Sequence, residues 1–113
     1  MTLAVASRNV SGVLVVRLKG RITMGDGSVQ IREAIRESID NGQTRILLDL
    51  GDVNYIDSSG LGELVAGYTT AANRGAQLKL LNVDKKVHDL LQLTKLYTVF
   101  DIYDNETKAL ASF

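Results

Sequence analysis

The chain of 113 residues contains no cysteine and no proline, and it has a single histidine. The absence of cysteine excludes disulfide bonds and thiolate chemistry, and one histidine leaves little from which a zinc site could be built. Lys plus Arg equals Asp plus Glu at 13 each, so the formal net charge is zero. Because nucleic acid is usually met by a basic face, this balance argues against direct nucleic-acid binding.

The sequence also lacks long apolar runs. Nothing approaches the roughly 18 consecutive apolar residues of a membrane-spanning helix. The first ten residues, MTLAVASRNV, lack the basic segment followed by an apolar stretch that marks a secretory signal. With 45% hydrophobic residues, the chain can bury one core and is too short for two. We therefore expect a single domain over residues 1–113 that is soluble, cytoplasmic and not inserted in a membrane.

Apolar periodicity predicts alternating strands and helices. Residues 3–8 and 13–18 predict the two strands of a hairpin, because turn-forming residues separate them. Ile31, Ile35 and Ile39 recur at the spacing of a helix, which Asn41-Gly42 ends. The other expected elements are a strand over 45–50, a helix from Leu61 to Gly75, a strand over 77–83, a helix around 87–91 capped by Asp84, a strand over 98–103 and a short helix over 106–111.

This order, β-β-α-β-α-β-α-β with a possible final helix, predicts an α/β fold. Right-handed crossovers imply a mixed, mainly parallel sheet of about five strands with three to four helices, to which the first hairpin adds an antiparallel strand. In such sheets, functional groups gather where strands end and helices begin. The segment NYIDSSGLGE at 54–63 occupies a place of this kind.

The polar residues of this segment have a purely structural interpretation. The first N–H groups of a helix lack partners, and Asp or Ser side chains satisfy them, so Asp57, Ser58 or Ser59 could serve as the cap. A cap of this kind contributes about 1 kcal/mol to stability, which is reason enough for its presence. Local physics alone favours a cap over catalytic chemistry.

Catalytic and cofactor motifs are missing from the segment. A nucleophile elbow needs glycine two positions before its serine, and neither serine here has one. His88 falls on the third predicted helix, where a surface position is more common than a catalytic one. Gly60 and Gly62 lack the third glycine of a dinucleotide loop, and Asp57 with Glu63 are acids that a helix start favours through its dipole. The sequence favours a protein that is not an enzyme, with no metal site and no cofactor.

A serine at a helix start has a second use. A phosphate placed there would meet backbone N–H groups and a favourable dipole, so the domain could carry it without unfolding. Phosphorylation adds roughly −1.5 to −2 charges, which would oppose a partner docked on the same surface. Such a switch needs no catalytic residue in the chain itself.

Three stretches, in order, then carry a family resemblance over nearly the whole chain. They are VVRLKGRI, RILLDLGDVNYIDSSGLG and GAQLKLLNVDKKVHDLLQLTKLYTVFDIYDNETKAL. In this set the chain resembles the bacterial anti-sigma factor antagonists, whose STAS domain is shared with sulphate transporters. The core motif DSSGLG is moderately specific by itself, and the ordered set of three is strongly so.

The resemblance implies a regulatory protein that binds an anti-sigma factor serine kinase of the GHKL ATPase type. The unphosphorylated antagonist holds the kinase and frees the sigma factor, phosphorylation ends the complex, and a serine phosphatase restores it. The phosphoacceptor of the family maps onto Ser58, with Ser59 as second choice. Asp57 maps onto the neighbouring acid and Gly60 onto the tight helix start.

By the same resemblance, the partner surface borders the phosphoacceptor. It comprises Thr23, Asp26, Ser59, Leu61, Gly62 and Glu63. Thr23 stands where several antagonists have an acidic residue, and Asp26 lies nearby but off that register. This departure gives weight to an alternative of another class: a STAS subunit that is not phosphorylated, either a scaffold in a stress-sensing complex or an accessory subunit of a membrane lipid transporter.

Overall fold

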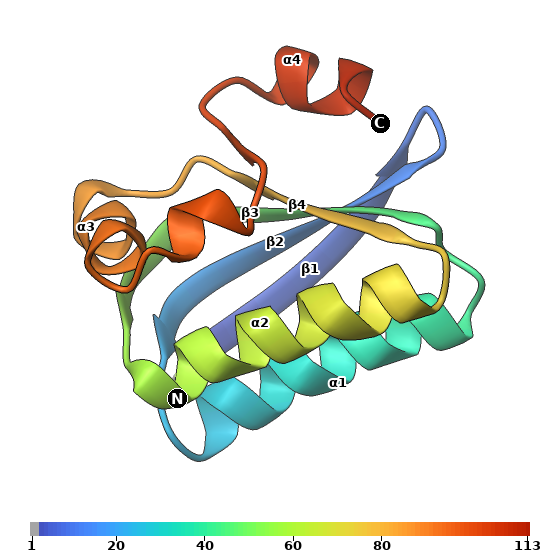
Figure 1. Ribbon diagram of the computed structural model, residues 1–113. Helices are drawn as coiled ribbons and strands as arrows, with labels where there is room; N and C mark the ends of the chain where they lie inside the picture. The colour runs from blue at the N-terminus through green and yellow to red at the C-terminus, as the bar shows by residue number, and fades with distance from the viewer. Residues whose placement is uncertain (1–2) are drawn as a thin grey trace.

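The computed structural model describes residues 3–113 and shows a five-stranded sheet in the order β1-β2-β3-β4-β5 (Figure 1). The strands are β1 (Leu3–Val10), β2 (Val13–Ile22), β3 (Arg45–Ile56), β4 (Gln77–Leu81) and β5 (Ile102–Tyr103). The helices are α1 (Asp26–Asp40), α2 (Ser58–Asn73), α3 (Lys85–Leu93) and α4 (Glu106–Ala111), with a 3-10 helix η1 (Leu96–Thr98). β1 pairs antiparallel with β2 and the other pairs are parallel, which confirms the predicted mixed sheet.

Helices α1 and α2 lie side by side against one face of the sheet (Figure 1). The isoleucine stripe of α1, Ile31, Ile35 and Ile39, is buried there, as its helical spacing predicts. Helix α3 adds Val87 and Leu91 to the same apolar core. This core holds the sheet and three helices together.

All five strands have bounds other than those expected, and β3 and β5 differ most. β3 continues past residue 50 to Ile56, paired with β2 through two register shifts. The prediction of a strand over 98–103 is wrong except at residues 102–103, which form β5. Phe100 is buried and meets the Tyr68 ring edge-on at 5.5 Å between centroids, so this apolar run packs a loop against the core without strand pairing. Lys95, just before that segment, has a left-handed backbone conformation (φ 61°).

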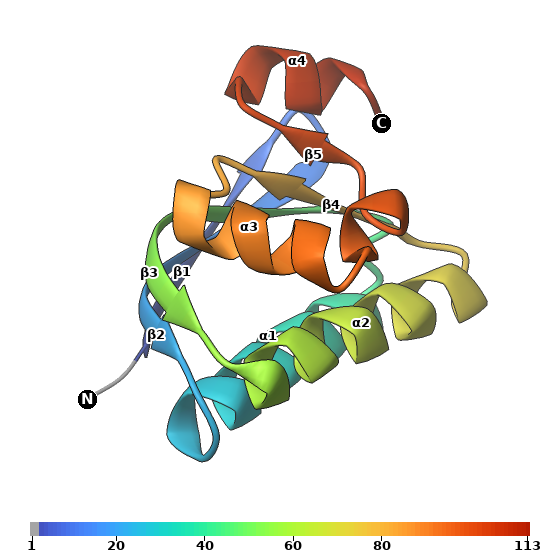
Figure 2. The same ribbon diagram turned by 60° about the vertical axis from the view of Figure 1, so that its left-hand side comes forward.

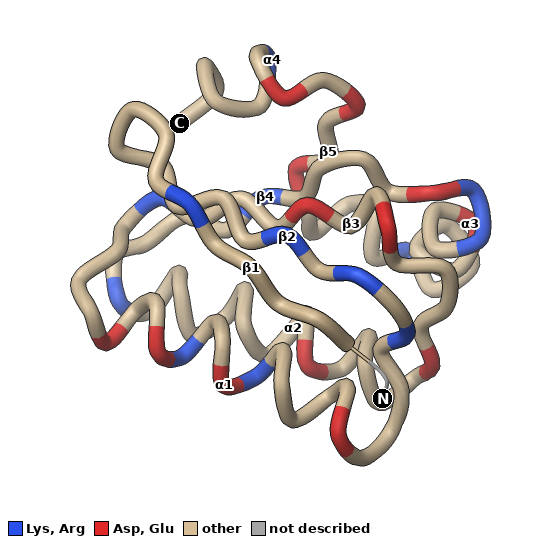
Figure 3. The backbone as a smooth tube through the Cα atoms, turned by 180° about the vertical axis from the view of Figure 1, so that it is seen from behind, with Lys and Arg blue, Asp and Glu red and all other residues tan. Residues whose placement is uncertain are grey.

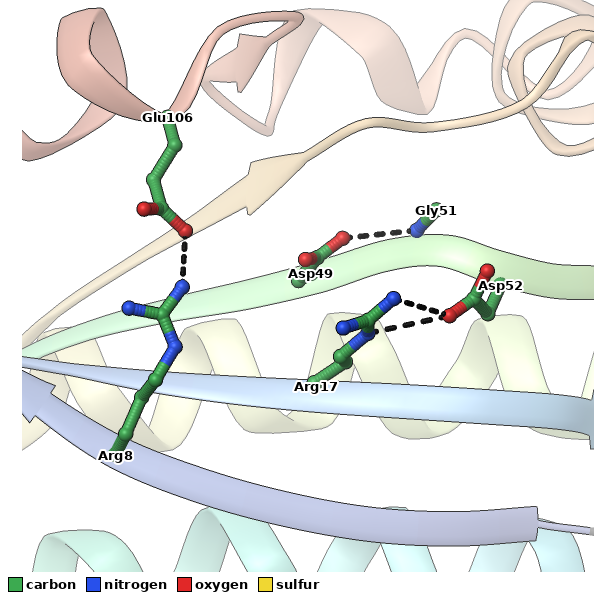
Figure 4. A network of polar contacts seen from close by, with 6 residues as sticks. All are labelled: Arg8, Arg17, Asp49, Gly51, Asp52 and Glu106. Carbon is green, nitrogen blue, oxygen red and sulfur yellow. Dashed lines mark hydrogen bonds and ion pairs between the residues drawn. The ribbon is translucent and has the colours of Figure 1, made fainter.

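Helix α4 covers part of the opposite face of the sheet, over an apolar cluster formed by Val13, Val15, Leu47, Leu81 and Ala109. The rest of that face is charged: seen from behind, basic residues of β2 lie beside acidic residues of β3 (Figure 3). Figure 4 shows two ion pairs on this side. Arg8 of β1 pairs with Glu106 of α4, and Arg17 of β2 pairs with Asp52 of β3 at 2.7 Å.

Lys79 of β4 is a buried cation beneath α4. Its Nζ donates to the Ser112 carbonyl oxygen at 2.8 Å and to Ser112 Oγ at 3.0 Å. The same nitrogen lies 4.8 Å from the centroid of the Phe113 ring, and 3.9 Å from Asp101 Oδ2. Buried charge is tolerated when it is paired and hydrogen-bonded in this way, so Lys79 fastens the residues after α4 to the sheet.

We expect Lys79→Ala to lower the free energy of unfolding by about 2–3 kcal/mol, because it removes charged hydrogen bonds and leaves the partly buried carbonyl of Ser112 without its donor. The control is Arg74→Ala, which breaks an exposed ion pair with Asp40 and should cost less than about 1 kcal/mol. Urea unfolding of both variants measures the difference. Equal effects would show that Lys79 does not fasten the end of α4.

Candidate functional site

The site predicted from the sequence lies where β2 and β3 leave the sheet. These strands are parallel, and their register places Ile22 opposite Ile56, so both strands end at the same edge of the sheet. The N–H of Asp57 donates to the carbonyl oxygen of Ile22 at 3.1 Å, which continues the pairing by one residue. The loop after β2 therefore runs directly beside the first turn of α2.

Asp57 joins the two segments through its side chain. Oδ1 accepts from the Gly60 N–H and Oδ2 accepts from the Met24 N–H, both at 2.9 Å. The backbone of Asp57 is extended (φ −100°, ψ −177°), which directs its carboxylate back over the start of the helix. Asp57 is thus the N-cap, and the suggestion that Ser58 or Ser59 caps the helix is wrong. Both serines belong to the first turn of α2.

These hydrogen bonds lower the pKa of Asp57 below its ordinary value of 3.8. The largest cause is the backbone N–H of Gly60, followed by that of Met24, while burial opposes the shift. Each N–H favours the charged carboxylate over the neutral acid. The carboxylate is therefore ionised throughout the neutral range and serves as a fixed acceptor for two backbone donors.

Gly60 packs against both exiting strands. A Cβ atom at this position would lie 2.6 Å from the Ile22 carbonyl oxygen and 2.8 Å from a side-chain carbon of Ile56. Because the carbonyl is backbone held in the sheet, it cannot move aside for a side chain. The glycine lets the helix start approach the strands closely enough for Asp57 to reach its donors.

The two serines differ in exposure. Ser58 is exposed, whereas Ser59 is half-buried. Ser58 also stands at the edge of a groove of about 550 Å³ between the start of α2 and helix α3. The groove is lined by Tyr55, Ile56, Asp57, Ser58, Leu61, Lys86, Val87, Leu90 and Thr94.

The other residues expected at the partner surface fall in different environments. Thr23 is half-buried, and its carbonyl oxygen accepts from the Ser28 N–H at 3.0 Å. Asp26 is exposed as the first residue of α1. Leu61 is buried but reaches the groove, and Gly62 is exposed with nothing near its Cβ position. The structure thus places all of them at the same end of the molecule and leaves their contacts with a partner open to test.

Glu63 has a structural partner that the sequence did not indicate. Its Oε2 accepts from Arg32 of α1 at 2.9 Å, so the pair connects the two helices that lie side by side. Two further features were missed: the Met24 N–H that binds Asp57, and the contribution of α3 to the groove. Lys86, Val87 and Leu90 of α3 lie on one side with its C-cap Thr94, but no local pattern tells which helix that side meets.

The described residues offer no metal centre, because no three His, Asp or Glu side chains among residues 3–113 converge. His88 lies on α3 but is not among the residues that line the groove beside Ser58. Over the same range, none of the helices combines the length and apolar composition needed to cross a bilayer.

Residues 4–109 match the model of the STAS domain. The chain belongs to the STAS domain family. This STAS domain is 33% identical over 111 residues to the anti-sigma F factor antagonist of Paenibacillus polymyxa, across 97% of this chain and 94% of the relative. The resemblance seen in the sequence is therefore confirmed at the level of the family.

Solved structures share the fold of this STAS domain. An anti-sigma factor antagonist from Mycobacterium paratuberculosis has a TM-score of 0.87 at 22% identity, covering 98% of this chain and 93% of that one. The Bacillus cell fate determinant SpoIIAA, solved in its phosphorylated form, has a TM-score of 0.74 at 23% identity, covering 96% and 98%. The sheet order and helix placement are thus those of the family.

The lowered pKa of Asp57 generates a pH-dependent prediction. A depressed folded-state pKa contributes stability above the unfolded value of 3.8, and that stability is lost as the pH falls through the folded-state pKa. We expect Asp57→Ala to melt at a lower temperature than wild type at about pH 7, with the gap narrowing toward about pH 2 as the wild-type carboxylate gains its proton.

Thermal melts of the two proteins across that pH range measure the gap. The matched control is Asp26→Ala, which removes an exposed acid from the first turn of α1 and should change the melting temperature far less. A gap for Asp57→Ala that stays constant with pH would show that its charge state does not stabilise the fold.

Proposed function

We propose that this chain is an anti-sigma factor antagonist, a partner-switching module that binds an anti-sigma factor serine kinase and is released when Ser58 is phosphorylated. The observation that carries the proposal is an exposed serine in the first turn of α2, directly after the capping Asp57. The relationship to the Paenibacillus polymyxa antagonist over nearly the full length supports it.

The first turn of α2 suits a phosphate on Ser58. Backbone N–H groups and the positive end of the helix dipole favour negative charge at this end. Asp57 already uses both carboxylate oxygens on the Gly60 and Met24 N–H groups. The cap and the phosphate would therefore use different donors, and the modification leaves the helix start in place. SpoIIAA, of the same fold, has been solved in phosphorylated form, which supports this compatibility.

The choice of Ser58 over Ser59 rests on exposure. A kinase must bring ATP to within bonding distance of the hydroxyl, and only the exposed serine is presented without displacing neighbouring atoms. Ser59 is half-buried and sits one residue deeper in the turn. In this proposal Asp57 presents Ser58 by fixing the helix start, and Gly60 allows that start to lie close to the strands.

The partner surface follows from the same connection. Because the Met24 N–H binds Asp57, the loop carrying Thr23 is held beside the start of α2. Thr23, Asp26 and Gly62 then form one preorganised surface with Ser58, which reduces the entropy lost on binding. The proposed partners are a serine kinase of the GHKL ATPase type and a serine phosphatase, and the chain would act with them in the cytoplasm.

Incubation with the cognate kinase and ATP should place phosphate on Ser58, mapped by mass spectrometry of the peptide that contains both serines. Ser58→Ala should abolish the modification, and Ser59→Ala should retain it. A kinase that is active on a reference antagonist but modifies neither serine would contradict the proposal. That outcome would favour the non-phosphorylated scaffold or transporter subunit.

Ser58→Asp should mimic the modified state in binding without harming the fold. We expect its melting temperature to stay within a few degrees of wild type, because the position is exposed. Its affinity for the kinase should fall by about tenfold or more, since an interface charge without a partner costs several kcal/mol. The control is Ser58→Asn, because asparagine has the size of aspartate but no charge. Calorimetric titration measures the affinity of both variants for the kinase. Equal weakening by Asn and Asp would contradict a charge-driven release.

A further inference from the structure

The groove beside Ser58 has apolar walls from two sides. Ile56 and Leu61 come from the end of β3 and the start of α2, while Val87 and Leu90 come from α3. Figure 2 shows α3 lying across from the first turn of α2. Such a depression on a surface near an expected interface is typical of a pocket that accepts an anchor side chain.

Tyr55 lines one side of the groove and has a basic partner on the neighbouring strand. Tyr55 is 43% exposed, so its ring is accessible to another molecule. The guanidinium of Arg21 lies 4.6 Å from the centroid of the Tyr55 ring, and the two residues are paired in register across β2 and β3. This cation–π contact favours a position of the ring at the edge of the groove, where it can meet another surface.

Only one of the two charged residues that line the groove is available to pair with another molecule. Asp57 and Lys86 are its two charged lining residues, and the carboxylate of Asp57 is committed to backbone N–H groups. The neighbouring Lys85 points elsewhere, where its Nζ lies 3.7 Å from Asp89. Lys86 is therefore the charge that the groove offers to a partner, and it selects for an acidic group.

We propose that this groove docks a segment of the partner kinase that carries a large apolar side chain next to a carboxylate. The apolar side chain fills the space between Leu61 and Leu90, and the carboxylate pairs with Lys86. The inference rests on the proposed function, because Ser58 lines the same groove and a kinase that reaches Ser58 also covers it. A phosphate on Ser58 then places negative charge beside the incoming carboxylate, which favours release.

Two matched pairs of variants test the docking. Lys86→Glu reverses a charge in the groove, and Lys85→Glu makes the same change on the adjacent residue outside it. Leu90→Gln makes the groove polar, and Leu93→Gln makes the same change at an 82% exposed position that does not line it. Calorimetric titration with the purified kinase used in the Ser58 assay gives the dissociation constants, after melting curves have shown that each variant folds.

We expect Lys86→Glu and Leu90→Gln each to weaken binding by about tenfold or more, and the Lys85 and Leu93 variants to stay within about threefold of wild type. Equal effects within each pair, with wild type still bound and phosphorylated, would overturn the groove and leave the proposed function standing. A wild-type protein that neither binds the kinase nor accepts phosphate would instead overturn the proposed function itself. A change of oligomeric state in Leu90→Gln alone, with unchanged kinase affinity, would assign the groove to a second copy of this chain and overturn the inference.

Discussion

A single carboxylate connects the two chain segments on which the site depends. Asp57 accepts from Gly60 in the helix that it caps and from Met24, which is 33 residues away in the sequence. Backbone pairing of Asp57 with Ile22 already brings the loop after β2 beside the first turn of α2. The carboxylate then holds the backbone of that loop, at Met24, to the start of the helix. The geometry of the chain around Ser58 is therefore a product of backbone hydrogen bonding as much as of side-chain identity.

The two faces of the sheet are stabilised by different contacts, and the candidate site lies on only one of them. On one face, α1, α2 and α3 share the main apolar core. On the other, α4 rests on a smaller apolar cluster and is fastened at its ends by Glu106 and by the contacts of Lys79 with Ser112. The groove beside Ser58 belongs to the helices of the first face, so charge changes there need not disturb the second.

The sequence predicted most of the fold because local patterns and core packing agree. Asp84 was expected to cap the third helix, and its carboxylate accepts from the Val87 N–H at 2.9 Å. The end of β3 was missed because the residues after Leu50 are partly exposed and lack an apolar run. The strand expected over 98–103 failed for the opposite reason: the apolar Phe100 is buried by a loop, and burial alone does not distinguish a loop from a strand.

The sequence predicted where the candidate residues lie in the fold but not what they contact. The motif placed Asp57 and Ser58 at a helix start, and the structure puts them there. The partner of Asp57 in the loop after β2 is a backbone N–H, which any residue except proline supplies, so the identity of Met24 carried no signal. The contribution of α3 depends on how the crossover after β4 folds back on the sheet. That arrangement is a property of the whole topology and not of any short stretch.

The close approach of Gly60 to Ile22 also determines what the motif tolerates under substitution. Position 60 is closed to any side chain, because a carbonyl of the sheet occupies the space that even a methyl group needs. Position 62 lies two residues further along the same helix. A Cβ atom there would have nothing within 4 Å, so the position is sterically open to every residue type that a helix accepts. Two glycines that look alike in the motif thus record different constraints: the first is required by the fold of this chain, and the second is free to vary unless another molecule comes close to it.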